Sequence, residues 1–363
     1  MRGRYSRYYI ILTATATMLF ALLSSSCGSD IPDEGREQKM VNNNEVWGYM
    51  DVNGVIVIEP QFKQAANFHE GYARVDFGGL WGFINKNGNM IIEPKYREAG
   101  DFHEGLAAVK VDDKWGYIDG SGDMIISPQF DYARSFHDGL ACVSIAEKRG
   151  YIDVSGRMVI EPIYKWAFDF SEGLAFVWMD DRYSVINGLG EIVFDLQPEA
   201  TVELLEGQLS TGFSEGLKCI LINGNYGFID NAGVVVIEPR FDFAYDFQDG
   251  LAAIKINDMW GYINKDGIEV IEPQYESASS FQEGLAPVLL NGKYGYINKD
   301  GELVIEPRFD VALGFHDSRA ETHVDNRLGF IDKSGDIMIE VDCFANPFSE
   351  GYAAISTKIS SNQ

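Results

Sequence analysis

The chain has 363 residues, and its 29 Lys and Arg against 55 Asp and Glu give a formal charge of −26. A nucleic-acid partner needs a basic stripe to neutralise its phosphates, and this acidic composition contains none. We therefore exclude nucleic acid as a binding partner. Direct docking of the protein on anionic lipid is disfavoured unless divalent ions bridge the charges.

Residues 1–26 have the pattern of a cleaved export signal. Three arginines precede an apolar run at 10–23, which is shorter than the ~20 residues of a bilayer span. The following Leu-Ser-Ser-Ser-Cys-Gly resembles a bacterial lipobox, and the resemblance implies a lipid on Cys27 and a polar tether over residues 27–46. We expect an exported protein, lipid-anchored in the outer membrane of a Gram-negative bacterium and exposed at the cell surface.

From residue 47 onward, one motif is written nine times. Seven of the eight steps between copies are 34 residues, and the step from 183 to 226 is 43. A fixed period of this size indicates a repeat architecture in which each unit buries its apolar face against its neighbours. The copies begin at Trp47, Trp81, Trp115, Arg149, Tyr183, Tyr226, Trp260, Tyr294 and Leu328.

Each copy predicts three short strands, as the second copy illustrates. A strand at 81–85 ends in a Lys-Asn-Gly turn, where glycine supplies the positive φ of a tight hairpin. A second strand at about 90–92 is stopped by Pro94, which cannot donate to a ladder. A loop ending in an acidic residue and glycine leads to a third strand at 106–111, whose residues alternate with period 2. The array is therefore predicted to be all-β.

The recurring Trp-Gly, Val-Ile-Glu-Pro and Glu-Gly-Leu-Ala segments resemble the bacterial WG-repeat (KWG-type) family over residues 47–356. The resemblance implies an envelope or secreted array of β-meanders, mostly without an assigned activity. The fifth copy departs from the pattern with Tyr183-Ser184 and an insertion near 196–212. The ninth copy has Val341 in place of proline and is one residue short, and residues 357–363 form a tail.

The repeats are compatible with two overall arrangements, one open and one closed. We expect an open solenoid or superhelix, because 34 residues are few for a four-stranded blade and nine copies exceed the usual 4–8 blades of a propeller. The alternative is a closed propeller-like ring, in which a final strand at 352–356 pairs with the first strand at 47–50. Residues 38–41 would otherwise serve as the partner of that first strand.

Two acidic positions recur in register. We interpret them as structural, with each carboxylate accepting N–H groups of its own turn, and calcium is the alternative because it prefers carboxylate oxygens. No calcium-binding loop motif is present, so no metal or other cofactor is predicted. The first set is Glu59, Glu93, Glu161, Glu238, Glu272, Glu306 and Glu340, with Asp195 and Ser127 in the other copies. The second set is Glu70, Glu104, Asp138, Glu172, Glu215, Asp249, Glu283, Asp317 and Glu350.

The aromatic residues that open most copies are interpreted as core packing, with the following glycine making room for the ring. A sugar-stacking platform is the alternative. These residues are Trp47, Trp81, Trp115, Tyr183, Tyr226, Trp260 and Tyr294. Four of the five histidines share one loop position with Ser and Gln, which indicates a hydrogen-bonding group and not a metal ligand. Cys142, Cys219 and Cys343 are expected to be free thiols.

No catalytic motif is present, and a repeated pattern argues against a singular active site. We therefore expect a non-enzymatic envelope lipoprotein that binds or scaffolds through its repeat surface. A protein partner is preferred over a glycan, and the membrane is reached through Cys27. The alternative is a glycan-binding protein or a carboxylate-based hydrolase with its site near the insertion.

Overall fold

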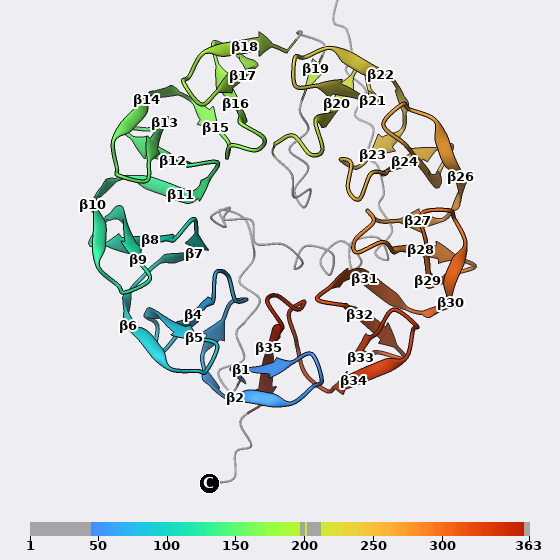
Figure 1. Cartoon of the computed structure of the whole chain (residues 1–363), viewed down its shortest axis with the longest axis horizontal. Helices are drawn as coiled ribbons and strands as arrows, with labels where there is room; N and C mark the ends of the chain where they lie inside the picture. Colours follow the sequence, from blue (N-terminus) through green and yellow to red (C-terminus); the bar gives the residue numbers. More distant parts are fainter. Residues whose placement is uncertain (1–44, 197–199, 202–211, 359–363) are drawn as a thin grey trace, which may run out of the picture.

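The computed structural model describes residues 45–196, 200–201 and 212–358, which form nine small antiparallel sheets arranged as blades around a central opening (Figure 1). The predicted signal peptide, Cys27, nearly all of the tether, most of the insertion and most of the tail lie outside these residues. Among the described residues, no helix has the length and apolar character that a membrane crossing requires.

Blade two shows the regular plan. Its strands run from the central opening outward as β3 (Gln64–Ala65), β4 (Tyr72–Asp76), β5 (Trp81–Asn85) and β6 (Met90–Tyr96). The sequence pattern predicted the second, third and fourth of these strands. The innermost strand falls in the segment predicted to be a loop, because it has only two residues in several blades and no alternating pattern. Eight of the nine blades are therefore four-stranded where three strands were expected.

The other blades follow the same order. Blades three to five contain β7 (Ala99–His103), β8 (Leu106–Val111), β9 (Lys114–Asp119), β10 (Met124–Phe130), β11 (Tyr132–His137), β12 (Leu140–Ile145), β13 (Lys148–Asp153), β14 (Met158–Tyr164), β15 (Trp166–Ala167), β16 (Leu174–Met179), β17 (Arg182–Asn187) and β18 (Ile192–Asp195). Blades six to nine contain β19 (Ala200–Thr201), β20 (Leu217–Ile222), β21 (Asn225–Asp230), β22 (Val235–Phe241), β23 (Phe243–Ala244), β24 (Ala252–Ile256), β25 (Met259–Ile263), β26 (Glu269–Tyr275), β27 (Ser277–Ala278), β28 (Ala286–Leu290), β29 (Lys293–Ile297), β30 (Leu303–Phe309), β31 (Val311–His316), β32 (Arg319–Val324), β33 (Arg327–Ile331) and β34 (Ile337–Val341).

Blade one closes the ring. Its strands are β35 (Tyr352–Lys358), β1 (Glu45–Asp51) and β2 (Ile56–Phe62), and β35 pairs with β1 from Glu45↔Lys358 to Asp51↔Tyr352. The prediction of an open solenoid is therefore wrong, and the closed alternative describes the molecule: a nine-bladed β-propeller. The physical reason is that β1 starts the array without an inner neighbour, and the last repeat supplies that neighbour from the other end of the chain.

The core consists of apolar side chains packed between successive blades. Between blades two and three, for example, Phe83 and Ile92 pack against Phe102 and Ile118, and all four are almost completely buried. Burying a side chain of this size contributes roughly 1.5–3 kcal/mol. Buried tyrosines add hydrogen bonds between blades, as in blade four, where the Tyr151 hydroxyl donates to the carbonyl of Phe168, 2.6 Å away and directly after the inner strand of blade five.

In seven blades, the glycine after the opening residue makes room for backbone and not for an aromatic ring. In blade two a Cβ on Gly82 would lie 2.5 Å from the carbonyl oxygen of Ile92 and 2.8 Å from the nitrogen of Pro94. The outer strand bulges here, since Trp81 pairs with Tyr96 while Phe83 pairs with Ile92. Glycine and proline are therefore a coupled pair, with the bulged Glu-Pro segment lying directly on the glycine.

Candidate functional site

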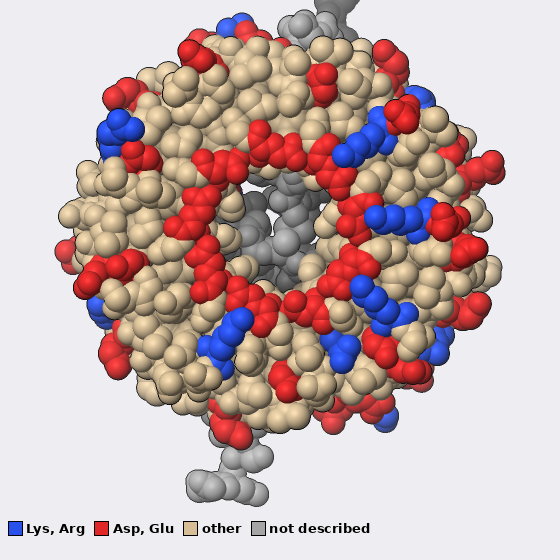
Figure 2. Space-filling model, viewed as in Figure 1, with Lys and Arg blue, Asp and Glu red and all other residues tan. Residues whose placement is uncertain are grey.

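An acidic ring surrounds the central opening on one face of the molecule, as Figure 2 shows. Its members are the second recurring set of acids, one per blade, in the turn that precedes the second strand; a glycine follows each acid except Asp317, which is followed by Ser318. Each has a positive φ, between 51° and 55°, which is uncommon for a residue other than glycine. The ring consists of Glu70, Glu104, Asp138, Glu172, Glu215, Asp249, Glu283, Asp317 and Glu350.

Each carboxylate of the acidic ring accepts a hydrogen bond from the turn of the next blade. The Glu70 carboxylate accepts the backbone N–H groups of Glu104 and Gly105 at 2.7 and 2.8 Å. Each of the other acids of the ring accepts an equivalent N–H from the next blade. The ring closes where the Glu350 carboxylate accepts the N–H of Gly71 at 2.9 Å. The donors were expected in the acid's own turn. Their position in the neighbouring turn lets each carboxylate join two blades.

Lysines neutralise one part of the acidic ring and leave another part uncompensated. Lys86, Lys265 and Lys333 pair with ring carboxylates at 3.0, 3.1 and 3.0 Å. Burial by itself would raise the pKa of Glu350, but the Lys86 ammonium and the Gly71 N–H outweigh it and hold the pKa below its usual range. Within the described residues, four consecutive carboxylates have no ion pair, and we call them the uncompensated arc: Glu70, Glu104, Asp138 and Glu172.

The histidine position lies next to each acid of the ring. His69, His103 and His137 follow one another in neighbouring blades, with ring centroids 5.4 and 5.1 Å apart. Serine at this position donates to the next blade, as when the Ser171 hydroxyl bonds the carbonyl of Phe213 at 2.8 Å. In the described part of the chain, no group of three or more His, Cys, Asp or Glu side chains is arranged to hold a metal ion.

The first recurring set of acids lies on the outermost strands, away from the acidic ring. Glu59, Glu93 and their counterparts are exposed and, among described residues, their carboxylates make no hydrogen bond or ion pair, so they do not cap their own turns. Where a proline follows the glutamate, the two residues place a charge and a missing N–H on the exposed edge strand. This combination opposes pairing with another sheet. Asp195 differs, because it accepts the Ser184 hydroxyl at 2.6 Å and pairs with Arg182.

The opening aromatics are packed between blades and only partly accessible. Tyr226 and Tyr294 are buried, whereas the four tryptophans and Tyr183 are half-buried. Trp260 stacks on Tyr245 with ring centroids 5.4 Å apart, and the Arg74 guanidinium lies 5.2 Å from the ring centre of Trp81. These contacts cover part of each ring, so the residues do not form a continuous aromatic row.

The remaining candidates are accounted for individually. Cys142 and Cys219 are buried free thiols that donate to the carbonyls of Ala167 and Ala244, and Cys343 is a half-buried free thiol. Burial raises the pKa of Cys142 to about 12, so this thiol is unreactive at neutral pH.

The hydrolase site predicted as an alternative near 196–212 falls mostly outside the described residues.

Comparison with known proteins supports the repeat assignment. Seven segments, more than half of the chain, match the family model described as WG containing repeat, and the unmatched parts contain the divergent fifth and ninth copies. The matched residues are 47–81, 81–115, 115–148, 150–183, 226–260, 260–294 and 294–326. No curated protein matches the sequence.

Solved structures resemble this chain only at very low sequence identity. A eukaryotic initiation factor is 9% identical, with a TM-score of 0.52 over 88% of this chain and 99% of that chain. PorZ, a bacterial surface component of the type-IX secretion system of Porphyromonas gingivalis, is 11% identical with a TM-score of 0.32 over 80% and 46%. Hsv2 of Kluyveromyces lactis is 11% identical with a TM-score of 0.36 over 71% and 96%. The first likeness supports the fold alone, and we draw nothing from the other two.

Proposed function

Because the chain belongs to the WG-containing repeat family and its repeats close into a propeller, we propose that it is a non-enzymatic binding and scaffold module of the cell envelope. The observation that carries this proposal is the acidic ring. Near-equivalent carboxylates placed around one opening offer many similar contacts to a large partner, whereas catalysis requires a single arrangement of different groups.

The partner that suits this surface best is a protein with basic side chains. Among the described residues, Glu70, Glu104, Asp138 and Glu172 make no ion pair, and an exposed negative arc attracts positive charge over a Debye length, ~8 Å at physiological salt. A glycan is less well supported, because the opening aromatics are partly covered by neighbouring side chains.

Photo-crosslinking tests which face binds. Asn87 lies in an exposed turn on the side of the acidic ring, and Asp113 lies in an exposed turn at the opposite end of the blades. We expect a crosslinker at Asn87 to give a discrete adduct in intact cells, and a crosslinker at Asp113 to give none. The Asn87 adduct should weaken when Glu70, Glu104 and Glu172 are changed to Gln. Equal adducts from both faces, or no adducts, would contradict the proposal.

The proposed localisation to the cell envelope is tested separately. We propose that Cys27 carries a lipid and that the propeller is held outside the cell by residues 27–46. Cells labelled with radioactive palmitate should incorporate label into the wild-type chain and not into Cys27→Ser. Hydrolysis of an envelope polymer that is abolished by Asp195→Asn would instead favour the hydrolase.

A further inference from the structure

The contact between glycine and proline is repeated in seven blades. A Cβ on the glycine would lie 2.6–2.8 Å from the proline nitrogen in every case, so the Glu-Pro or Ser-Pro segment rests directly on the glycine. The pairs are Gly48 and Pro60, Gly82 and Pro94, Gly116 and Pro128, Gly150 and Pro162, Gly227 and Pro239, Gly261 and Pro273, and Gly295 and Pro307.

The two divergent blades treat this contact differently. Blade five lacks both residues, since buried Ser184 stands at the glycine position and pairs directly with Asp195 of β18. Blade nine keeps Gly329 and has Val341 instead of proline. Its outer strand pairs without the bulge, as Leu328↔Val341 and Gly329↔Glu340. A Cβ on Gly329 would approach only Ile339 O at 3.0 Å and Ile337 Cγ2 at 3.4 Å.

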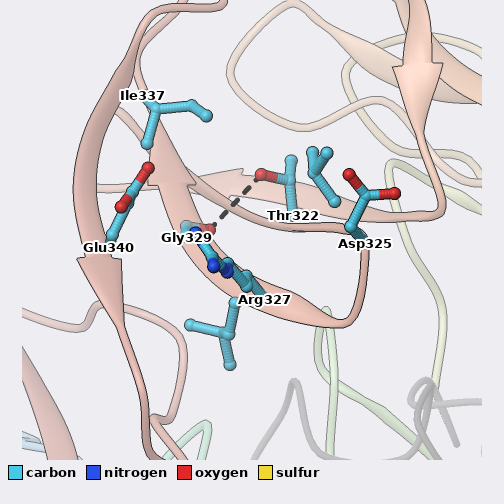
Figure 3. A pocket seen from close by; sticks show the side chains of 8 residues that line it. Thr322, Asp325, Arg327, Gly329, Ile337 and Glu340 are labelled. Carbon is cyan, nitrogen blue, oxygen red and sulfur yellow. Dashed lines mark hydrogen bonds between the residues drawn. The ribbon is translucent and has the colours of Figure 1, made fainter.

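A pocket of about 370 Å³ is lined by Gly329, the glycine that has no proline against it (Figure 3). Ile337 and Glu340 of the outer strand line one side, and Thr322 lines the other, with its hydroxyl donating to the Gly329 carbonyl at 3.4 Å. Asp325 and Arg327, at the adjacent turn, line the remaining part. We call this the blade-nine pocket.

Arg327 lacks the acidic partner that its counterparts in blades three and eight have. In blades three and eight, lysines at this position, Lys114 and Lys293, pair with aspartates 17 residues later. The residue 17 positions after Arg327 is Phe344. Within the described residues, the exposed Arg327 guanidinium makes no ion pair or hydrogen bond. The blade-nine pocket therefore has both a glycine without its proline and a cation without its carboxylate.

We propose that the blade-nine pocket binds an extended segment of another protein that contains proline and, within about three residues, a carboxylate. Blade eight provides the template, because Pro307 lies on Gly295 and Asp310, three residues later, pairs with Lys293. A partner segment repeats these contacts on Gly329 and Arg327. Proline suits such a surface because it has no N–H that burial would leave without an acceptor. A second copy of this chain fits less well, since its seven repeat prolines already lie on their own glycines.

This inference goes beyond the envelope role and does not depend on the acidic ring, so purified full-length protein suffices to test it. The probe is a fluorescein-labelled peptide with the sequence of residues 303–310, Leu-Val-Ile-Glu-Pro-Arg-Phe-Asp. Fluorescence anisotropy should show saturable binding that weakens roughly fivefold or more when the peptide proline is replaced by alanine. Replacing the peptide aspartate by asparagine should weaken binding as much as Arg327→Gln does, with no further loss when the two changes are combined.

A graft of the blade-eight sequence into blade nine supplies a control variant that should fold but should not bind the peptide. Replacing residues 341–343 by the sequence of residues 307–310 restores both the proline and the missing residue, so the pocket is filled within the chain. This variant should melt at or above the wild-type temperature and lose at least tenfold in peptide affinity. Lys293→Gln, beside a filled contact in blade eight, should bind as the wild type does.

Three outcomes would overturn the proposal. One is the absence of saturable binding up to millimolar peptide. Another is equal affinity of the wild type and the graft variant. The third is a marked gain in affinity when Pro32 and Asp33 are changed to Ala and Asn, because the chain's own tether would then be the occupant.

Discussion

Blades eight and nine are neighbours written in the same 34-residue pattern, but they complete it differently. In blade eight, Gly295 is covered by Pro307 and Lys293 is paired with Asp310. In blade nine, Gly329 and Arg327 stand at the same positions without those partners. A repeat can therefore keep its fold while losing its internal contacts, and each lost contact leaves a group free to bind something else.

The largest expected difference between the two blades concerns glycine. In Gly295→Ala, the new Cβ would lie 2.5 Å from the Ile305 carbonyl oxygen, so backbone must move, and we expect the free energy of unfolding to fall by about 3 kcal/mol. Gly329→Ala places its Cβ at 3.0 Å or more from its neighbours and should cost ~1 kcal/mol or less. Urea unfolding of both variants measures this. Equal losses would mean that the proline contact is not what makes the glycine necessary.

The residue that pairs with this glycine on the neighbouring strand should give a smaller difference in stability between the two blades. It is tested by exchanging valine and threonine at the two positions. Val288 pairs with Gly295 and is fully buried, whereas its counterpart Thr322 pairs with Gly329 and bonds its carbonyl. Val288→Thr buries a hydroxyl in an apolar contact and should cost about 1.5 kcal/mol. Thr322→Val should change the free energy of unfolding by about 0.5 kcal/mol or less, because its hydrogen bond is long. Thermal unfolding of the two reciprocal variants checks this, and a larger loss for Thr322→Val would contradict it.

A pH-dependent difference is smaller still. Burial lowers the pKa of His316 in blade nine below the usual value of 6.5, against the opposing effect of Glu283 and Asp317, while blade eight has Gln282 at this position. As pH falls below about 6.5, the unfolded chain takes up a proton that folded His316 resists, so the free energy of unfolding decreases. His316→Gln should flatten this part of the stability profile between pH 7 and 5. An unchanged profile would assign the effect to other groups.

The smallest effect is local and visible only by NMR. Asp310 has its pKa lowered first by Lys293 and then by the N–H of Asp325, which reaches across from blade nine. Lys293→Gln should raise the pKa of Asp310 toward its ordinary value, and Arg327→Gln should leave it unchanged. A shift of similar size in both variants would show that Arg327 also senses this carboxylate.

The repeat period predicted the strands well because each strand carries its own signal. The Trp-Gly strand and the alternating strand after Glu-Gly lie where the pattern placed them. The strand predicted to stop at Pro94 instead continues to Tyr96, because a bulge opposite Gly82 accommodates the proline. The innermost strand was missed, since pieces such as Gln64–Ala65 are too short for a period to appear. Closure was missed as well. Whether β35 reaches β1 depends on the small rotation between successive blades, and no single repeat encodes that rotation.

The chemistry of the surface was only partly accessible from the sequence. The acids of the ring were identified, but their donors lie about 35 residues away in the next turn, as with Glu104 and Gly139, so a local rule assigned them to the wrong turn. The blade-nine pocket had a sequence signal, because Val341 replaces proline after a retained glycine. Its meaning required knowing that proline lies on glycine in the other blades.

The closure of blade one determines how the molecule responds to mechanical load. The two ends of the described chain, Glu45 and Lys358, form the first pair of the β1–β35 ladder. A force pulling these ends apart acts on one pair of residues at a time and opens the ladder as a zipper. A force applied through the N-terminus against an object bound on the acidic ring is instead shared among neighbouring blades, because each ring carboxylate joins two of them.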